Sequence, residues 1–319
     1  MLPSVAGGSS AEDLPRVTVF GPHPILDITI ERRGTDEDDV HLHPGGQGVW
    51  VARMAGQMGA HPILCGFCGG ETGKLLAPLL EELPGERRLI ETSAAAGSWV
   101  IDRRSGKREM IAHAWSDPPT RHEIDDLFSV TIASALSSGV LVVCGPVPSN
   151  ALPDEVYARL VRDARAHGTK VVVDLSPPRL DSALEGGPDV VKADEWQLAQ
   201  LTGEDTRDPG AFRRAAQAAL DRGAQMVVAT RGADPVLLLS REGRAWEIVP
   251  PVFEEGAAEG SGDSMVGTIA AALARGLRQE DALRLAAAAG ATNFLRHGLG
   301  TGSRAVVEEL VKRVDVRAV

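Results

Sequence analysis

The sequence contains no long apolar run, little cysteine and no excess of positive charge, and each absence excludes a class of protein. A membrane-spanning helix needs a run of about 18 apolar residues, so we expect none here. The net charge of −11 argues against non-specific binding to nucleic acid or to an anionic membrane, because such binding requires clustered positive charge. Residues 1–14 lack the basic start and the apolar middle of a signal peptide, so we expect a disordered tail and a cytoplasmic protein.

The chain has only three cysteines, and this small odd number indicates a reducing compartment rather than a disulfide framework. Cys65 and Cys68 form a C-x-x-C pair, which is compatible with a redox site or with half of a zinc site. There is no second C-x-x-C, and the pair continues a strand-like apolar segment. We therefore expect these residues, and Cys144, to be buried thiols that pack as small apolar side chains.

The order of the apolar segments predicts the fold class. The 319 residues are enough for one large α/β domain with a small appendage, or for two domains. Uniformly apolar strands that alternate with helices are typical of a doubly wound, mostly parallel sheet covered on both faces. The expected strands are 16–21, 63–67, 140–144, 170–174, 189–192 and 225–229. The expected helices are 46–59, 73–83, 153–167, one ending at 201, 210–222, 264–275 and 281–297.

Two segments, 27–44 and 93–116, do not follow this alternation. Residues 27–31 and 40–44 are predicted to be extended, with an acidic loop at 35–39 between them. Residues 99–112 are predicted to form a hairpin. We expect the two segments to form a separate small sheet.

Three polar residues fall at the ends of expected parallel strands. They are Asp174, Asp194 and Thr230. Ligands of parallel α/β sheets gather at the carboxyl ends of the strands. These residues therefore mark the expected ligand edge.

The most informative motif is Gly260-Ser261-Gly262-Asp263, which lies directly before a helix-like segment. Glycine-rich backbone at the start of a helix leaves several N–H groups pointing at one spot, and the helix dipole adds partial positive charge there. Such a place suits a phosphate. The Asp263 carboxylate would lie beside it, and donors for a moving charge next to a base are what phosphoryl transfer to a hydroxyl requires.

Two further glycine motifs carry weaker signals. Pro44-Gly-Gly-Gln-Gly48 opens a helix, and it gains significance only beside the Gly260 loop. Gly69-Gly-Glu-Thr-Gly-Lys74 departs twice from a P-loop, because Cys68 and Leu75 occupy positions that require glycine and a hydroxyl. We expect no P-loop here.

Two clusters of basic residues are interpreted without a function. His41 and His43 lie on one strand face without a third ligand, so we expect a surface strand rather than a metal site. Arg103, Arg104, Lys107 and Arg108 are expected to form a solvated hairpin tip.

The chain resembles the PfkB (ribokinase-like) carbohydrate kinases, and within them the 1-phosphofructokinase and tagatose-6-phosphate kinase branch. The resemblance runs from Arg16 to about Val314. Four segments carry it: Gly21-Pro-His-Pro-Ile-Leu-Asp27 is similar to N-P-x-x-D, Gly45-Gly-Gln-Gly-Val-Trp-Val-Ala52 to G-G-K-G-x-N-V-A, Val191-Lys-Ala-Asp-Glu-Trp-Gln197 to V-K-P-N-x-x-E, and Gly260-Ser-Gly-Asp-Ser-Met-Val-Gly267 to G-A-G-D-S-M-V-G. The last segment is the most specific.

The resemblance implies one ribokinase-like domain over residues 15–319, with a small β-sheet lid formed by 27–44 and 93–116. It implies that Asp263 is the base that activates the sugar hydroxyl, and that the backbone of Gly260, Ser261 and Gly262 holds the transferring phosphoryl group. The expected sugar-binding residues are Asp27, Gly45, Gly46, Gln47 and Trp50. The expected residues for ATP and Mg2+ are Lys192, Asp194, Thr230, Gly232, Asn293 and Gly298, with Asp194 at the metal.

Several positions depart from the family pattern. Gln47 replaces a lysine, Trp50 replaces an asparagine, and the arginine that binds a substrate phosphate in this branch has no clear counterpart around Gly97-Ser-Trp99. A neutral amide gives up charge-assisted hydrogen bonds, so these changes bear on whether the acceptor carries a phosphate. Gln197, Pro235 and Glu259 depart on the nucleotide side; they replace a glutamate, a glycine and a neutral residue.

Three functions stay open at this point. The leading hypothesis is an ATP-dependent kinase that phosphorylates a hydroxymethyl group of a hexose phosphate such as fructose 1-phosphate. Gln47 and Trp50 favour a kinase of an unphosphorylated sugar or nucleoside instead. The departures together favour a non-catalytic ligand-binding protein that has kept the fold, which the presence of Asp263 opposes. The family resemblance also admits a homodimer.

Overall fold

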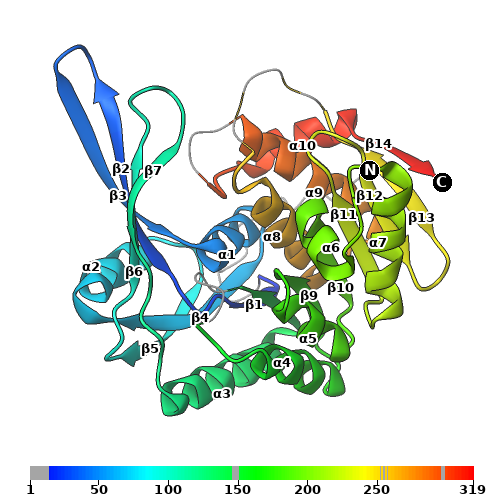
Figure 1. Cartoon of the computed structure of the whole chain (residues 1–319), viewed down its shortest axis with the longest axis horizontal. Coiled ribbons are helices and arrows are strands. Elements are labelled where there is room, and N and C mark those ends of the chain that lie inside the picture. The colour runs from blue at the N-terminus through cyan, green and yellow to red at the C-terminus, as the bar shows by residue number, and fades with distance from the viewer. Residues whose placement is uncertain (1–13, 146–150, 252, 254–255, 257, 296–298) are drawn as a thin grey trace.

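The computed structural model describes residues 14–145, 151–251, 253, 256, 258–295 and 299–319, so the predicted tail lies almost wholly outside the described residues. Among the described residues, ten strands form the main sheet (Figure 1). In spatial order they are β14 (Asp315–Ala318), β13 (Ala245–Val249), β12 (Val236–Ser240), β11 (Met226–Thr230), β10 (Val190–Asp194), β9 (Lys170–Asp174), β8 (Val140–Cys144), β1 (Arg16–Phe20), β4 (His61–Gly69) and β5 (Glu86–Thr92). The strands from β11 to β5 run parallel, and β12 to β14 are antiparallel.

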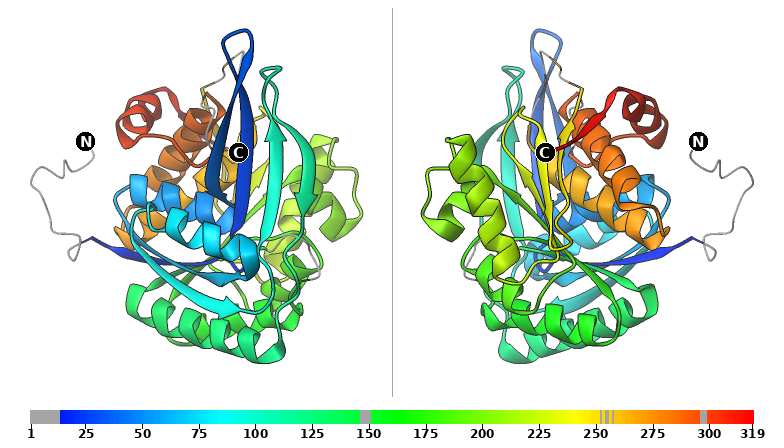
Figure 2. Two further views of the ribbon diagram at one scale, coloured as in Figure 1. Left: turned by 90° about the vertical axis from the view of Figure 1, so that its left-hand side faces the viewer. Right: turned by 90° about the vertical axis from the view of Figure 1, so that its right-hand side faces the viewer.

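Helices cover both faces of this sheet (Figures 1 and 2). One face carries α3 (Arg121–Ser138), α4 (Glu155–Ala166), α5 (Arg179–Glu185), α6 (Glu195–Thr202) and α7 (Pro209–Asp221). The other carries α1 (Gln47–Gln57), α2 (Gly70–Leu80), α8 (Ser261–Ala274), α9 (Gln279–Phe294) and α10 (Arg304–Leu310), which is followed by the 3-10 turn η2 (Val311–Arg313). Each face has its own core, because successive residues of a strand point to opposite sides: Val140 and Val142 join one core, and Leu141 and Val143 join the other. The predicted fold class is confirmed.

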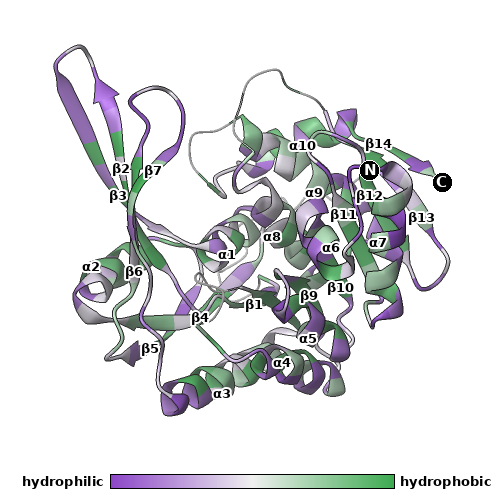
Figure 3. Cartoon of the chain, in the orientation of Figure 1, coloured by the Kyte–Doolittle hydropathy of each residue, from purple (hydrophilic) through white to green (hydrophobic). Residues whose placement is uncertain are grey.

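A second, four-stranded sheet extends beyond the main body (Figures 1 and 2). Its strands lie in the order β3 (Glu37–Gly45), β2 (Ile25–Arg33), β6 (Gly97–Asp102) and β7 (Glu109–Ala114). Figure 3 shows apolar residues along the buried strands of the main sheet and hydrophilic residues along much of β3. The small sheet therefore has little core of its own, and it joins the body through the buried ends of β2 and β3.

The structure corrects some predicted boundaries. The predicted acidic loop at 35–39 is wrong beyond residue 36, because β3 begins at Glu37 and its backbone pairs with β2. Helix α2 lies three residues earlier than expected, and α9 ends at Phe294. The three cysteines are buried and free, as expected. None of the helices in the described part of the chain combines the length and the apolar character needed to cross a bilayer.

Two glycines hold the helices of the ligand edge close together. A Cβ atom at Gly48, in the first turn of α1, would lie 2.5 Å from the Cα of Gly21, which follows β1. A Cβ atom at Gly267, in α8, would lie 2.5 Å from the carbonyl oxygen of Val51 in α1. Because only glycine fits at such distances, α1 packs tightly against both β1 and α8, and the starts of the two helices become neighbours.

Candidate active site

Charged side chains meet at the carboxyl ends of β9 and β10, beside Thr230 at the end of β11, and this is the edge that the strand pattern predicts. Asp174 ends β9, and Lys192 lies near the end of β10 with its Nζ 3.5 Å from Asp174 Oδ2. Their side chains are 3% and 7% exposed. Burial works against the charged form of Lys192, but the carboxylates of Asp174, Asp194 and Asp263 outweigh it and raise its pKa. The lysine therefore stays a cation surrounded by carboxylates.

Asp194 ends β10 and caps α6. Its Oδ1 accepts a hydrogen bond from the Gln197 backbone N–H at 2.8 Å, and its own N–H donates to Gln197 Oε1 at 2.8 Å, which is a reciprocal capping box. The Gln197 amide also donates to Asp174 Oδ1 at 3.1 Å. Gln197, which stands where the family has glutamate, thus ties the ends of β9 and β10 together.

The predicted anion loop begins α8. Gly260 is the N-cap residue, with the left-handed φ of 76° that favours glycine. The Ser261 N–H donates to the Ala258 carbonyl at 3.1 Å in this structure, so the first-turn donors without an intrahelical acceptor are those of Gly262 and Asp263. A Cβ atom at Gly262 would lie 2.7 Å from Lys192 Nζ, so the ammonium group reaches the same spot.

Asp263, the third residue of α8, points into this cluster. Burial raises its pKa to about 7, and the negative charge of Asp174 acts in the same direction. The Lys192 ammonium and a hydrogen bond with Gln47 act the opposite way. A carboxyl group with a pKa near 7 can both take up and release a proton at neutral pH, which is the property required of a general base.

A cavity of about 420 Å³ opens beside the start of α8. Its polar lining includes Lys192, Asp194, Thr230, Asp234, Ser261 and the backbone of Gly232 and Gly262, and its apolar lining includes Val236, Phe253, Met265 and Phe294. A cavity with an apolar wall and a few convergent polar groups at one end is typical of a ligand site. Neither Glu259 nor Pro235, two of the departures noted above, lines it, and both are exposed.

Asn293 lies beside this cavity rather than in its lining. Its Nδ2 donates to the Glu259 carbonyl at 2.7 Å, and its Oδ1 accepts from the Gly300 N–H at 2.9 Å. The side chain is 1% exposed and joins the loop before α8 to the loop after α9. Gly298, the remaining residue predicted for the nucleotide, lies outside the described residues.

A second cavity, of about 410 Å³, lies between the small sheet and α1. Asp27, Trp50, Arg53, Arg103 and Arg108 line it, together with Thr29, Glu31, His41, His43, Pro44, Leu299 and Thr301. Burial raises the pKa of Asp27 to about 6, against the charges of Arg108 and Arg53, which act to lower it. Asp27 Oδ2 lies 4.0 Å from an Arg108 nitrogen, and Asp27 Oδ1 is buried without a hydrogen-bond partner.

The arginines of this cavity correct one prediction and add a residue that sequence reasoning missed. The side chains of Arg103 and Arg108 are 13% and 17% exposed, so these two do not belong to a solvated tip. Arg104 and Lys107 are exposed as expected, and Arg104 pairs with Asp102 and Asp38. Arg53 donates to the Leu299 carbonyl at 2.8 Å. Its position one turn after Trp50 in α1 was the available signal, because residues three apart share a helix face.

The glycine loop at 44–48 separates Asp27 from Asp263. A Cβ atom at Gly45 would lie 2.5 Å from Asp27 Oδ2, and Gly46 caps α1 with a φ of 98°. Gln47 begins α1, and its Oε1 accepts a hydrogen bond from the Gly145 N–H at 3.0 Å. His41 and His43 stack on β3, and the described residues contain no cluster of three or more His, Cys, Asp or Glu side chains suited to a metal.

The two cavities meet at the start of α8. Ser261 and Gly262 line the first, while Leu299 lines the second and lies against Gly260, where a Cβ atom would be 3.2 Å from the leucine side chain. The structure thus brings four of the predicted nucleotide residues, Lys192, Asp194, Thr230 and Gly232, to one cavity, and two of the predicted sugar residues, Asp27 and Trp50, to the other.

Comparisons with known proteins identify the family and the fold. The family described as pfkB family carbohydrate kinase matches residues 25–305. The chain is 28% identical over 268 residues to the ATP-dependent 6-phosphofructokinase isozyme 2 of Escherichia coli K12, covering 81% of this chain and 83% of that protein. A crystal structure of phosphofructokinase-2 from Escherichia coli superposes with a TM-score of 0.83 at 25% identity, covering 94% of this chain and 99% of that one. A possible 1-phosphofructokinase from Thermotoga maritima superposes with a TM-score of 0.84 at 20% identity, covering 95% and 99%, and so supports the fold.

Proposed function

This chain belongs to the pfkB family of carbohydrate kinases and is an ATP-dependent sugar kinase, and on that premise we propose that it transfers the γ-phosphoryl group of ATP to a hydroxymethyl group of a hexose phosphate, with fructose 1-phosphate as the type of acceptor. The similarity to a 6-phosphofructokinase supports a phosphorylated hexose as the acceptor class. The arginines of the second cavity carry the proposal.

The acceptor occupies the cavity between the small sheet and α1. Arg53 and Arg108 flank Asp27 there, and Arg103 lines the same wall. Guanidinium groups bind phosphate through paired, charge-assisted hydrogen bonds, while the buried Asp27 oxygen that has no partner suits a sugar hydroxyl. Arg108 thereby supplies a positive charge for the substrate phosphate, which the segment around Gly97-Ser-Trp99 lacks.

ATP occupies the cavity of about 420 Å³, with its phosphates toward Gly262 and Lys192 and its base toward the apolar wall. Mg2+ fits Asp194, which lines this cavity, because Mg2+ is usually held by one or two carboxylates together with the nucleotide phosphates and water. When bound, Mg2+ neutralises charge on the phosphates.

The reaction takes place at the start of α8. Asp263 accepts the proton of the acceptor hydroxyl as its oxygen bonds to the γ-phosphorus, and the bond from that phosphorus to the ADP oxygen breaks. The N–H groups of Gly262 and Asp263, together with the Lys192 ammonium, hold the negative charge of the transferring group. Gly260 supplies the left-handed turn that aims these donors.

An acceptor panel tests the substrate class. We expect ADP release with hexose phosphates at far lower concentration than with fructose, ribose or a nucleoside.

Arg108→Met should raise KM for the phosphorylated acceptor about tenfold or more and leave any turnover of free sugar unchanged, because a lost charge-assisted contact costs at least about 1.4 kcal/mol. A preference for free sugars or nucleosides would favour the alternative in which Trp50 stacks on an uncharged acceptor.

The outer face of the small sheet supports a homodimer. Asp27, Thr29 and Glu31 line the cavity, so the alternate residues Ile28 and Ile30 face outward beside Leu42 and Val40. Leu42 and Val40 are 47% and 58% exposed. We expect a dimer by sedimentation and a monomer for Leu42→Glu; a monomeric wild type would count against this assembly.

A further inference from the structure

Two residues that follow α9, Leu299 and Gly300, connect the acceptor side of the molecule to the start of α8. Helix α8 packs between α1 and α9 (Figure 1). A Cβ atom at Gly260, the N-cap of α8, would lie 3.2 Å from the Leu299 side chain. A Cβ atom at Gly300 would lie 2.6 Å from the carbonyl oxygen of Trp50 in α1. We call Leu299 and Gly300 the bridge segment, because they touch the starts of both helices.

Arg53 holds the bridge segment from the side of α1. Its Nη1 donates to the Leu299 carbonyl at 2.8 Å, and its Nη2 donates to the Pro44 carbonyl at 3.3 Å. Pro44 lies near the end of β3, just before the glycine loop that begins α1. Hydrogen bonds from a charged donor are about twice as strong as neutral ones. One side chain of the acceptor cavity therefore joins the small sheet to the bridge segment.

Asn293 holds the bridge segment from the side of α8. Its Oδ1 accepts from the Gly300 N–H at 2.9 Å, and its Nδ2 donates to the Glu259 carbonyl at 2.7 Å. The amide orientation is unambiguous, because a backbone N–H can only donate and a carbonyl can only accept. Glu259 directly precedes the N-cap Gly260. The hydrogen bonds thus run from the acceptor cavity, through the bridge segment, to the loop that begins α8.

We propose that Arg53 is a positioning residue for phosphoryl transfer: it holds the bridge segment against Gly260, so that the N–H groups at the start of α8 face the γ-phosphate of ATP. The inference rests on the proposed function, because it takes ATP to lie against Gly262. It goes beyond that function by giving an arginine of the acceptor cavity an effect in the nucleotide cavity. Arg108 differs from Arg53, since its nitrogen faces Asp27 at 4.0 Å.

The test is the affinity for ATP, measured by calorimetry with Mg2+ and without any acceptor. In Arg53→Met we expect the Kd of ATP to rise about three- to tenfold, which is the range for a substitution that acts through a chain of contacts. ADP lacks the γ-phosphate, so its Kd should stay at the wild-type value. Arg53 is not among the residues that line the nucleotide cavity, so loss of a direct nucleotide contact does not account for such a difference.

Two further variants separate the hydrogen bonds of Arg53 from its charge. Arg108→Met removes a positive charge from the same cavity but leaves the bond to Leu299 in place, so the Kd of ATP should not change. Arg53→Lys keeps the charge, but an ammonium group lacks the planar fork that spans the Leu299 and Pro44 carbonyls. We expect it to restore most of the acceptor KM and little of the ATP affinity. Should Arg53→Met unfold, Arg53→Lys carries the test.

A double variant shows whether the two holders of the bridge segment act together. Asn293→Leu, which is similar in size, removes both hydrogen bonds on the α8 side, so it should also raise the Kd of ATP and spare that of ADP. Once the chain of contacts is cut at one end, a second cut adds little. Arg53→Met/Asn293→Leu should therefore bind ATP about as well as the weaker of the two single variants, whereas independent sites would give losses in binding free energy that add.

Three results would overturn the inference. An unchanged Kd of ATP in the Arg53 variants, with a raised acceptor KM, would make Arg53 an acceptor ligand only. Equal losses for ATP and ADP would indicate a general loosening of the fold, and additive losses in the double variant would show that Arg53 and Asn293 act separately. The proposed function fails in a different way: a wild type that binds no ATP, or that releases no ADP with any sugar, contradicts the kinase itself.

Discussion

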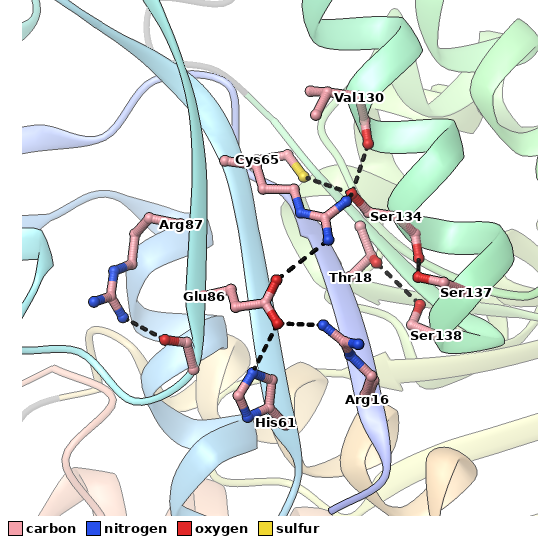
Figure 4. Close-up of polar contacts among 12 residues, drawn as sticks. Arg16, Thr18, His61, Cys65, Glu86, Arg87, Val130, Ser134, Ser137 and Ser138 are labelled. Carbon is pink, nitrogen blue, oxygen red and sulfur yellow. Dashed lines mark hydrogen bonds and ion pairs between the residues drawn. The ribbon is translucent and has the colours of Figure 1, made fainter. Parts of the chain in front are cut away.

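The two ends of the main sheet shift the pKa values of their carboxyl groups in opposite directions. At the amino ends of β1, β4 and β5, one carboxylate, Glu86, contacts Arg16, His61 and Arg88, with the His61 and Arg88 nitrogens at 3.4 and 3.2 Å (Figure 4). Burial acts to raise the pKa of Glu86, but the hydrogen bond from Arg88 and the charges of Arg16 and Arg88 outweigh it and lower that pKa. At the carboxyl ends, Asp174, Asp194 and Asp263 surround the ammonium of Lys192, and the pKa of Asp263 is raised to about 7.

The difference lies in the ratio of cations to carboxylates and in access to water. The Glu86 side chain is 40% exposed, whereas those of Asp174 and Lys192 are almost fully buried. At the amino end, therefore, the carboxylate has several positively charged neighbours, and these contacts link the edge strand β5 to β1 and β4. The carboxyl end is short of positive charge, and this suits a site whose ligand would bring its own cation. Substitutions at the two ends should consequently affect different properties.

The largest effect is expected for Asp263→Asn. Removing the general base should lower kcat about 10²–10⁴-fold, while ATP binding, measured by calorimetry, remains. Wild type and variant should also differ in their stability profiles. The pKa of folded Asp263 lies above its unfolded value, so the wild type loses stability as the pH rises from about 4 through about 7, and the variant does not. Full activity in the variant would show that Asp263 is not the general base.

The next largest effect is expected for Lys192→Met, which leaves Asp174 buried beside Asp263 without its cation. Breaking a buried pair costs about 3–5 kcal/mol, so urea unfolding should show a loss of that size at pH 8. The double variant Lys192→Met/Asp174→Asn should recover most of it, because the uncompensated charge is gone. A loss in Lys192→Met below about 1 kcal/mol, the value of an exposed pair, would mean that the two ends of the sheet do not differ in this respect.

How far the sequence predicts the fold depends on how locally each element is encoded. The apolar strands β8, β9, β10 and β11 were predicted because strands buried on both faces read as continuous apolar runs. Strand β5 was not, since Glu86-Arg-Arg-Leu-Ile-Glu-Thr92 is rich in charges that serve the amino-end cluster. Helix α3 was also missed, although Thr120 and Glu123 form a capping box at its start, because its apolar residues form only a weak stripe.

The residues of the site also differ in how locally the sequence encodes them. Backbone features that depend on glycine spacing, such as the Gly260 loop and the turn at Gly46, were predicted from the sequence, and the structure brings them to neighbouring positions. The roles of these residues stay predictions. The role of Arg108 could not be predicted: it reaches Asp27 through the pairing of β6 with β2 and β7, and such contacts between distant segments leave no local pattern. Asn293 was predicted from the resemblance, yet both of its polar groups bind backbone of the protein itself.

The smallest effect is expected for Glu86→Gln at the amino end. The ion pairs there are half exposed, so the loss in unfolding free energy should stay within about 1 kcal/mol and should shrink as salt screens the charges. Because the pKa of folded Glu86 is lowered, its contribution is present above the unfolded pKa and disappears as the pH falls through the folded value, so the difference from wild type should be largest at neutral pH. Glu91→Gln, on the same strand but outside the cluster, is the matched control. The value of kcat should be unchanged in both variants; a fall confined to Glu86→Gln would show that the amino end of the sheet is coupled to the end that is short of positive charge.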